Sequence, residues 1–267
     1  MRTIAVMNQK GGVGKTTTAV NVSAALAASG AKVALIDLDP QAHASLHFGV
    51  TFESEFPSVY DVLVNDESLA AVRRQVAENL WLVPAHLDLA AADFELSSVF
   101  GREMILRDKI AADDMEFDYI IVDCPPSLGV LTLNALSAVE EVFIPLQPHF
   151  LALHGLSKLL QTVELVSKRL NSKLRVSGVV LCMFEGRTAL AKEVAGDVRA
   201  FMESERGATS PWSDAIVFET NIRRNVRLAE APSFGQSIFD YDPRSNGAED
   251  YGALVKEIVA MRSSGDV

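Results

Sequence analysis

The fold is decided by residues 10–17, which read Lys10-Gly11-Gly12-Val13-Gly14-Lys15-Thr16-Thr17. This loop follows an apolar run at residues 3–7 and opens a helical pattern at residues 14–28. A glycine-rich loop between a strand and a helix turns backbone N–H groups toward phosphate oxygens, and the helix adds the positive end of its dipole. A flexible turn would leave the Lys-Thr pair unexplained. We therefore expect a phosphate-binding loop, with Lys15 reaching the β- and γ-phosphates and Thr16 binding Mg²⁺.

Short apolar runs alternate with helical patterns along the rest of the chain. Strands are expected at residues 3–7, 33–38, 80–83, 119–123, 142–146, 176–183 and 215–218. Helices are expected at residues 14–28, 68–77, 102–112, 156–170, 189–205 and 248–261. Such alternation predicts an α/β fold of the P-loop NTPase type, with a doubly wound, mostly parallel sheet flanked by helices. Since the alternation does not pause, we predict a single domain over residues 1–267, with ligands at the carboxyl ends of the strands.

Composition narrows the class of protein. Of 267 residues, 49% are hydrophobic and 22% are charged, which excludes a disordered chain, and no apolar run is long enough to predict a membrane span. Cys124 and Cys182 each lie in an apolar run, so no disulfide framework is expected. The first residues lack a secretory signal, and we expect a cytoplasmic protein. The net charge of −11 disfavours nucleic acid unless basic residues cluster.

Aspartates follow two of the expected strands. Asp37 and Asp39 come at the end of one apolar run, and Asp123 comes at the end of another. An aspartate in this place more often caps a turn than takes part in chemistry. Beside a phosphate loop the balance reverses, because Mg²⁺ prefers hard oxygen ligands and an attacking water needs an acceptor that orients it.

The loop departs from the standard pattern at Gln9, where a glycine is usual, and a second lysine, Lys10, follows. This resembles the deviant Walker A motif of the ParA/MinD family of ATPases, whose signature lysine reaches across a nucleotide-sandwich dimer to the partner's phosphates. The resemblance implies that Lys10, Lys15 and Asp39 are catalytic, with Asp39 positioning the water. It also implies that Asp123 holds Mg²⁺ through water beside Thr16, with Asp37 in support. The expected nucleotide contacts are Lys10, Gly11, Gly12, Val13, Gly14, Lys15, Thr16, Thr17 and Asn225.

Four further segments, at residues 59–63, 125–129, 225–232 and 241–245, are similar to Soj-type, chromosomal ParA proteins. No helix-turn-helix domain is expected before the loop, unlike in the longer plasmid ParA proteins. MinD proteins end in a basic amphipathic membrane helix, whereas residues 248–261 carry the apolar stripe of a core helix, so no membrane partner is expected. Nitrogenase iron protein holds its cluster through two cysteines, but neither Cys124 nor Cys182 lies on a glycine-rich surface loop, and we expect no cluster.

Basic residues gather in one stretch, since residues 168–227 contain 11 Lys and Arg against 7 Asp and Glu. A charged stretch is usually a solvated face. Soj-like proteins, however, bind DNA without sequence preference through surface arginines of the dimer. Arg187 and Arg227 match those positions, Arg224 is a neighbour, and Arg223 stands where a proline is usual. Contacts to phosphates through a few arginines predict weak, salt-dependent binding that dimerisation strengthens.

The resemblance implies a Mg²⁺-dependent ATPase that forms an ATP-dependent homodimer, binds DNA non-specifically and partitions a chromosome or plasmid. A ParB-like protein would stimulate its slow hydrolysis, and the protein would associate with the nucleoid. One alternative keeps this ATPase but changes the cargo to a chemoreceptor array, a carboxysome or a similar assembly. A second alternative is a DNA-independent metabolic or metal-delivery P-loop ATPase. The five histidines offer no metal-ligand pattern that favours it.

Overall fold

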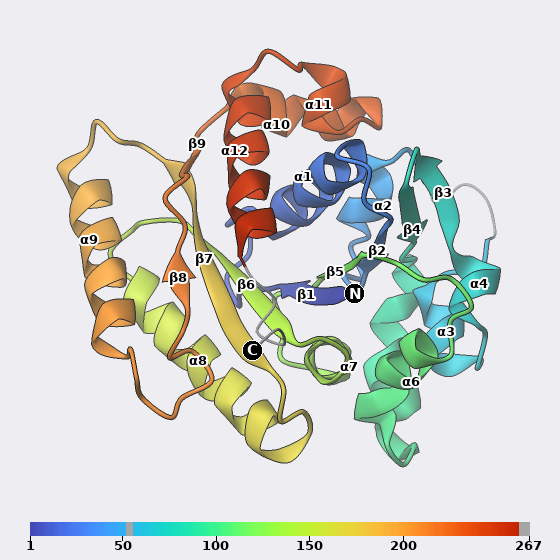
Figure 1. Ribbon diagram of the computed structural model, residues 1–267. Coiled ribbons are helices and arrows are strands. Elements are labelled where there is room, and N and C mark those ends of the chain that lie inside the picture. Colours follow the sequence, from blue (N-terminus) through green and yellow to red (C-terminus); the bar gives the residue numbers. More distant parts are fainter. Residues whose placement is uncertain (52–55, 262–267) are drawn as a thin grey trace.

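A twisted, nine-stranded sheet forms the centre of the computed structural model, which describes residues 1–51 and 56–261 (Figure 1). The strands follow the order β3-β4-β2-β5-β1-β6-β7-β8, and β9 pairs with β7. All pairs are parallel except β3 with β4. The strand bounds are β1 Arg2–Val6, β2 Val33–Asp37, β3 Arg74–Ala77, β4 Leu80–Val83, β5 Tyr119–Asp123, β6 Glu141–Leu146, β7 Arg175–Phe184, β8 Ile216–Val217 and β9 Ile222–Arg223.

Helices cover both faces of this sheet (Figure 1). Side chains of β1 and of the residue that follows it alternate between two cores: Ile4 and Val6 pack with α1 and α12, whereas Ala5 and Met7 pack with α7 and α8. Burial on both faces explains why the central strands are apolar throughout and do not alternate. The α-helix bounds are α1 Lys15–Ala28, α2 His43–His47, α3 Val59–Val64, α4 Leu69–Val72, α5 Ala92–Glu95, α6 Ile105–Ala111, α7 Val130–Ala138, α8 Ala152–Arg169, α9 Ala189–Ser204, α10 Val226–Glu230, α11 Ile238–Tyr241 and α12 Asn246–Ala260.

Short 3₁₀ turns complete the connections: η1 Leu87–Ala91, η2 Leu96–Ser98, η3 Arg102–Met104 and η4 Ala231–Phe234. The predicted α/β class with a mostly parallel sheet is confirmed. The helix predicted at residues 68–77 is wrong. There the chain forms the short α4 and then β3, an antiparallel edge strand whose residues alternate between half-buried and exposed. Asn79, with a φ of 57°, makes the tight turn that joins β3 to β4.

The last helix packs as its apolar stripe predicts. Tyr251, Leu254, Val255 and Ile258 are buried against α1 and its neighbours, and Val259 is exposed. Within the described residues, no helix combines the length and the apolar character needed to cross a membrane.

Candidate functional site

Three strands bring the predicted site residues together at one edge of the sheet. In register, Val6 of β1 and Asp37 of β2 both lie beside Asp123 of β5, which runs between them. Parallel strands end at the same edge, so the loop that follows β1 and the aspartates that end β2 and β5 must meet there. Positions far apart in the sequence therefore form one site.

Glycines shape the loop between β1 and α1. Gly12 and Gly14 have φ values of 72° and 96°, a region that strains side chains with a Cβ. At Gly14, which caps α1, a Cβ would also lie 3.5 Å from the Cys182 side chain of β7. The curled backbone and the start of α1 make a concave surface suited to an anion.

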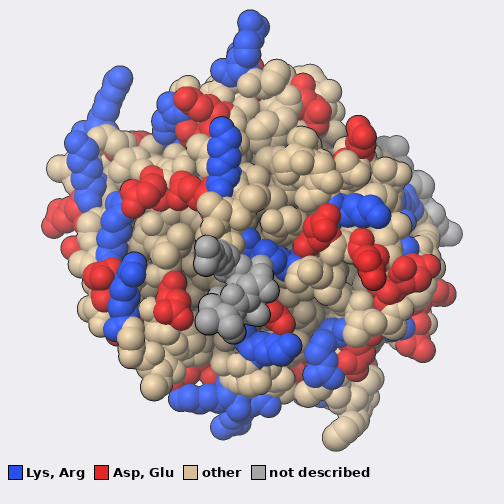
Figure 2. Space-filling view, viewed as in Figure 1, with Lys and Arg blue, Asp and Glu red and all other residues tan. Residues whose placement is uncertain are grey.

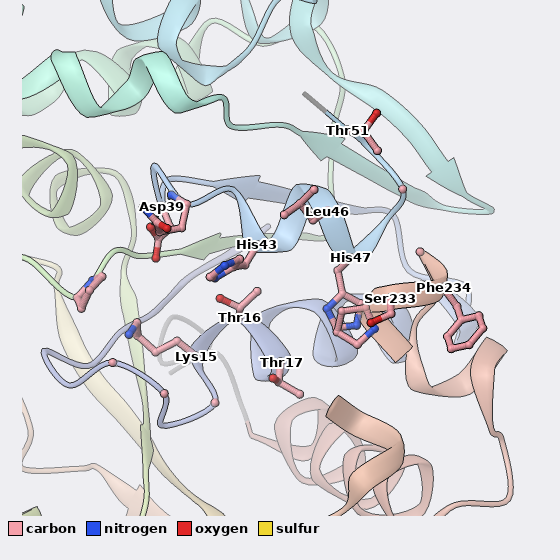
Figure 3. Close-up of a pocket in the computed structure, with 18 of the residues that line it drawn as sticks. Lys15, Thr16, Thr17, Asp39, His43, Leu46, His47, Thr51, Ser233 and Phe234 are labelled. Carbon is pink, nitrogen blue, oxygen red and sulfur yellow. Dashed lines mark hydrogen bonds between the residues drawn. The ribbon is translucent and has the colours of Figure 1, made fainter. Parts of the chain in front are cut away.

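Lys15 is buried at the start of α1, and its Nζ donates a hydrogen bond to the Lys10 carbonyl at 3.2 Å. Burial lowers the pKa of Lys15, and the carboxylates of Asp123 and Asp39 oppose that shift. Figure 3 shows Lys15 and Asp39 directed into the same part of a pocket, with Thr16 beside them. A cation held in this way faces incoming phosphate without a carboxylate bound to it.

Asp123 is fully buried, and neither oxygen of its carboxylate has a hydrogen-bond partner among the described residues. Burial raises the pKa of Asp123 well above its usual value, and the neighbouring Asp37 raises it further. The Thr16 hydroxyl and Lys15 act in the opposite direction. A buried carboxylate without partners is costly, so its oxygens suit a ligand that brings positive charge or ordered water.

Asp37 and Asp39 have different surroundings although they are two residues apart. Asp37 is buried and accepts hydrogen bonds from the Asp39 N–H at 3.1 Å, the Ser45 N–H at 2.8 Å and the Ser45 hydroxyl at 2.7 Å. Burial raises the pKa of Asp37 to about 6 against these bonds. Among the described residues, the carboxylate of Asp39 accepts one hydrogen bond, from the Gln41 N–H at 2.9 Å, and Asp39 lines the pocket. Asp37 therefore fixes the turn that presents Asp39.

The pocket has a volume of about 960 Å³ and runs from the loop toward η4 (Figure 3). Of the predicted nucleotide contacts, Lys10, Val13 and Asn225 do not line it. Val13 is buried, and Lys10 is exposed with its Nζ 2.6 Å from His149 Nε2. The residues of its far wall are not among the predicted nucleotide contacts. That wall consists of His43, Leu46, His47, Gly49, Thr51, Pro232, Ser233, Phe234 and Gly235.

Asn225 lines a second pocket of about 410 Å³, which shares Gly14, Thr17 and Met183 with the first. The Asn225 side chain caps α10 by accepting the Arg227 N–H at 2.8 Å. Met183 has a φ of 51°, unusual for a residue with a Cβ. The two pockets thus continue one another around the start of α1.

The four predicted DNA-binding arginines differ in their partners. Arg187 is exposed, and the described residues offer it no salt bridge. Arg224 pairs with Glu185 at 3.0 Å, and Arg227 pairs with Glu230 at 2.8 Å and Asp242 at 3.5 Å.

Arg223 is held most firmly of the four. The Arg223 guanidinium pairs with Asp250 and Glu249 of α12, each at 2.6 Å. The backbone N–H of Arg223 also donates a hydrogen bond to the Asp250 carboxylate at 2.9 Å. These hydrogen bonds raise the pKa of Arg223 above its already high value. In Figure 2, Lys and Arg lie along the side of α9 with Asp and Glu among them, whereas Asp and Glu gather over α3 and α4.

Both cysteines are buried away from the surface. Burial raises the pKa of the Cys124 thiol far above its usual range and that of Cys182 to about 12. Neither thiol is therefore reactive at neutral pH. Their surroundings are those of packed apolar side chains.

Comparisons with known proteins identify the family. A family model described as an AAA domain matches residues 1–176. The sporulation initiation inhibitor protein Soj of Bacillus subtilis is 46% identical over 258 residues, or 96% of this chain and 98% of that protein. The chromosome partitioning protein ParA of Myxococcus xanthus is 43% identical, over 97% of this chain and 88% of that protein. The chain belongs to the Soj/ParA family. This Soj/ParA protein is a partition ATPase.

A solved relative connects this Soj/ParA protein to its cofactor. Cobyrinic acid a,c-diamide synthase of Mycobacterium smegmatis, crystallised with an ATP analogue and magnesium, is 34% identical with a TM-score of 0.81. The similarity covers 97% of this chain and 94% of that one. Mg²⁺ accompanies ATP as the cofactor. The residues here fit it, since the Asp123 oxygens have no hydrogen-bond partner in the described part of the chain and the Thr16 hydroxyl lies beside them.

Proposed function

We propose that this Soj/ParA protein is a DNA-binding switch driven by ATP. Two chains would close around two ATP molecules, and the dimer would bind DNA without sequence preference. A ParB-like protein would stimulate slow hydrolysis and release the dimer during partition of a chromosome or plasmid. Such a cycle needs two states that differ in DNA affinity, and ATP supplies the bias between them. The protein would then be cytoplasmic and associated with the nucleoid.

One observation carries the proposal. The loop holds two lysines, and only Lys15 lines its own pocket, whereas the Lys10 amine lies outside it against His149. A cation on the rim of a phosphate site is placed to act on a second nucleotide brought by another chain. In that position Lys10 would neutralise charge that develops during γ-phosphoryl transfer, as an arginine finger does.

Within one chain, the loop and the aspartates would divide the chemistry. The N–H groups of Gly11, Gly12 and Gly14 would bind phosphate oxygens, and Lys15 would reach the β- and γ-phosphates. Mg²⁺, held by Thr16 and through water by Asp123, would neutralise phosphate charge. Asp39 would orient the attacking water, because it is the carboxylate that faces the pocket. Asp37 would support this site by holding the turn.

The rest of the nucleotide would extend around the start of α1. Thr17 lines both pockets, and Asn225 lines the smaller one. The base would occupy this second pocket, where the Asn225 amide NH₂ stays available because its oxygen caps α10. Val13 would contribute through its backbone, since its side chain is buried.

DNA would lie across arginines from both chains of the dimer. Arg187 forms no salt bridge with the residues that the structure describes and would bind phosphate directly, whereas Arg224 and Arg227 would exchange their present carboxylate partners for phosphates. Arg223 supports α12 in this structure, which weighs against a DNA contact from its side chain. Doubling a few weak contacts by dimerisation raises the affinity steeply.

Sedimentation velocity and ATP hydrolysis together test the nucleotide part of this proposal. We expect the Asp39→Ala protein to form dimers with Mg²⁺-ATP and monomers with Mg²⁺-ADP, because it binds ATP but cannot orient the water. A Lys10→Ala variant should remain monomeric in both. Parental hydrolysis by Asp39→Ala, or dimers of Lys10→Ala as stable as those of the parent, would contradict the assignment.

A second candidate is a DNA-independent metabolic ATPase, because one solved relative is named as a synthase of cobyrinic acid a,c-diamide. The two candidates share the loop, Mg²⁺ and ATP, so hydrolysis alone does not separate them. They differ in whether ATP changes the affinity for DNA. Identity of 46% to Soj against 34% to the synthase favours partition.

A further inference from the structure

The exposed amine of Lys10 is held by a residue from another part of its own chain. Lys10 Nζ lies 2.6 Å from Nε2 of His149, which follows β6 and is half-buried. The two segments are also joined beneath this contact. Asn8 accepts the Lys10 N–H at 3.0 Å and donates its side-chain amide to the Pro145 carbonyl of β6 at 2.8 Å. The loop is therefore tied to the chain around His149 at two points.

We propose that His149 is a positioning residue that holds Lys10 within its own chain until the ATP-bound dimer forms. The proposal rests on the function proposed above, in which Lys10 acts on the phosphates of the partner. Lys10 cannot lie against its own His149 and reach across an interface at the same time. The contact between Lys10 and His149 thus forms in the monomer and is broken in the dimer.

The second nitrogen of the imidazole makes this contact one of two alternatives. His149 Nδ1 lies 3.2 Å from the N–H of Leu151, the residue that caps α8, and is placed to accept a hydrogen bond from it. A neutral imidazole has one acceptor nitrogen. Burial and the Lys10 charge lower the pKa of His149, which favours the neutral ring. The ring can therefore accept from the ammonium or from the backbone N–H, but not from both.

This competition gives the segment two discrete arrangements. While Lys10 is bound, His149 Nε2 accepts the stronger, charge-assisted hydrogen bond from its ammonium, and the Leu151 N–H donates to water instead. When Lys10 leaves, the ring changes tautomer and Nδ1 accepts the Leu151 N–H, which satisfies one of the free donors at the start of α8. The gain at the helix offsets part of the loss at the lysine. Release is then reversible at a modest cost, as a cyclic switch requires.

The expected effect of removing His149 on dimerisation follows from the fraction of monomers in which Lys10 is free. If the free form of Lys10 makes up about one third of each monomer, removing His149 raises the competent fraction about threefold. A dimer needs two competent chains, so its association constant rises by about the square, or ninefold.

The reactivity of the Lys10 amine in the nucleotide-free protein tests the contact without any dimer. Brief acetylation with an N-hydroxysuccinimide ester, read by mass spectrometry, should modify Lys10 about threefold faster in His149→Leu than in the parent. His149→Gln keeps an acceptor oxygen and should react at close to the parental rate. His154→Leu, at an exposed histidine in the first turn of α8, is the matched control and should react at the parental rate. Equal rates in the His149→Leu variant and the parent would overturn the proposal.

Dimerisation with Mg²⁺-ATP provides the second readout. His149→Leu should shift the monomer–dimer midpoint to about ninefold lower protein concentration, whereas His149→Gln, which keeps an acceptor for Lys10, should leave the midpoint close to that of the parent. An equal shift in both variants would assign His149 a structural role and overturn the proposal. Faster acetylation of Lys10 with no dimer in any variant would support the contact and refute the dimer, so the two failures are distinguishable.

Discussion

The phosphate loop and the arginine surface differ in whether their cations are paired with carboxylates. The arginine surface consists of Arg187, Arg223, Arg224 and Arg227. Within the described residues, Lys15 is bound by a backbone carbonyl and Lys10 by an imidazole, and neither forms a salt bridge. Three of the four arginines are paired with carboxylates of their own chain. The loop is thus organised in advance for anions, whereas the arginine surface must first give up its own partners.

This difference predicts how each region responds to a phosphate. At the loop, binding brings negative charge to Lys15, which has no carboxylate partner among the described residues, and little has to rearrange around it. At the arginine surface, a DNA phosphate competes with Glu185 and Glu230. Binding there is weak for each contact and sensitive to salt. A surface of that kind suits reversible contact with DNA, and it agrees with a net charge of −11.

The largest effect is expected at the loop. Lys15→Ala removes the cation placed for the transferred phosphate, and we expect ATP turnover to fall at least about 100-fold. The matched control is Lys32→Ala, at an exposed lysine beyond the end of α1, which should leave turnover unchanged. A phosphate-release assay at saturating Mg²⁺-ATP measures both variants. Turnover of Lys15→Ala within a few-fold of the parent would remove the contrast between the two regions.

The next largest effect distinguishes Asp37, which ends β2, from Asp39, two residues further along the chain. Asp37→Ala leaves the N–H groups of Asp39 and Ser45 without their buried acceptor, and we expect the free energy of unfolding to fall by about 2–4 kcal/mol. Asp39→Ala removes one bond to a partly buried N–H and should cost under about 1 kcal/mol while stopping hydrolysis. Urea denaturation measures both. Equal destabilisation would show that Asp39, too, has a structural role.

The arginines themselves provide a finer test. Arg187→Ala should weaken binding to random-sequence DNA about tenfold and lower its salt slope by about two, one contact from each chain, with stability unchanged. Arg223→Ala should leave DNA binding unchanged and lower stability, because it removes the guanidinium that pairs with the buried Asp250, and we expect about 1–3 kcal/mol of destabilisation. Fluorescence anisotropy and thermal unfolding measure the pair. If Arg223→Ala weakened DNA binding with no loss of stability, Arg223 would belong to the DNA surface.

The smallest expected effect on DNA affinity comes from removing the carboxylate partner of Arg224. Glu185→Gln removes the carboxylate that pairs with the exposed Arg224, and DNA affinity in the ATP state should rise about two- to threefold. Glu193→Gln, on the exposed face of α9, changes the net charge equally and serves as the control. Identical gains in the two variants would trace the effect to net charge alone.

The buried strands and the glycine-rich loop could be predicted from the sequence, because neighbouring residues alone determine their structure. The strands ending at Val6, Asp37 and Asp123 are apolar and β-branched because both their faces are buried, and the glycine loop has no other common structural use. The edge strand β3 was mistaken for helix because an exposed strand lacks that continuous apolar pattern. Residues 68–77 contain alanines that also suit a helix.

Contacts between distant parts of the chain could not be predicted in this way. Ser45 binds Asp37 from eight residues away, and His149 reaches Lys10 from 139 residues away. The pairing of Arg223 with Asp250 depends on how α12 packs against β9. Nothing in the spacing of these residues encodes their approach. The far wall of the pocket, at η4, was missed for the same reason.

The central claim is that ATP converts this partition ATPase into a form that binds DNA. The most direct measurement is the affinity for random-sequence duplex DNA with Mg²⁺-ATP, Mg²⁺-ADP or no nucleotide, at low and at physiological salt. The account predicts binding with ATP only, which falls steeply as salt rises and weakens strongly in Arg187→Ala. Intact ATP hydrolysis with no DNA binding in any nucleotide state would contradict it and favour the metabolic candidate.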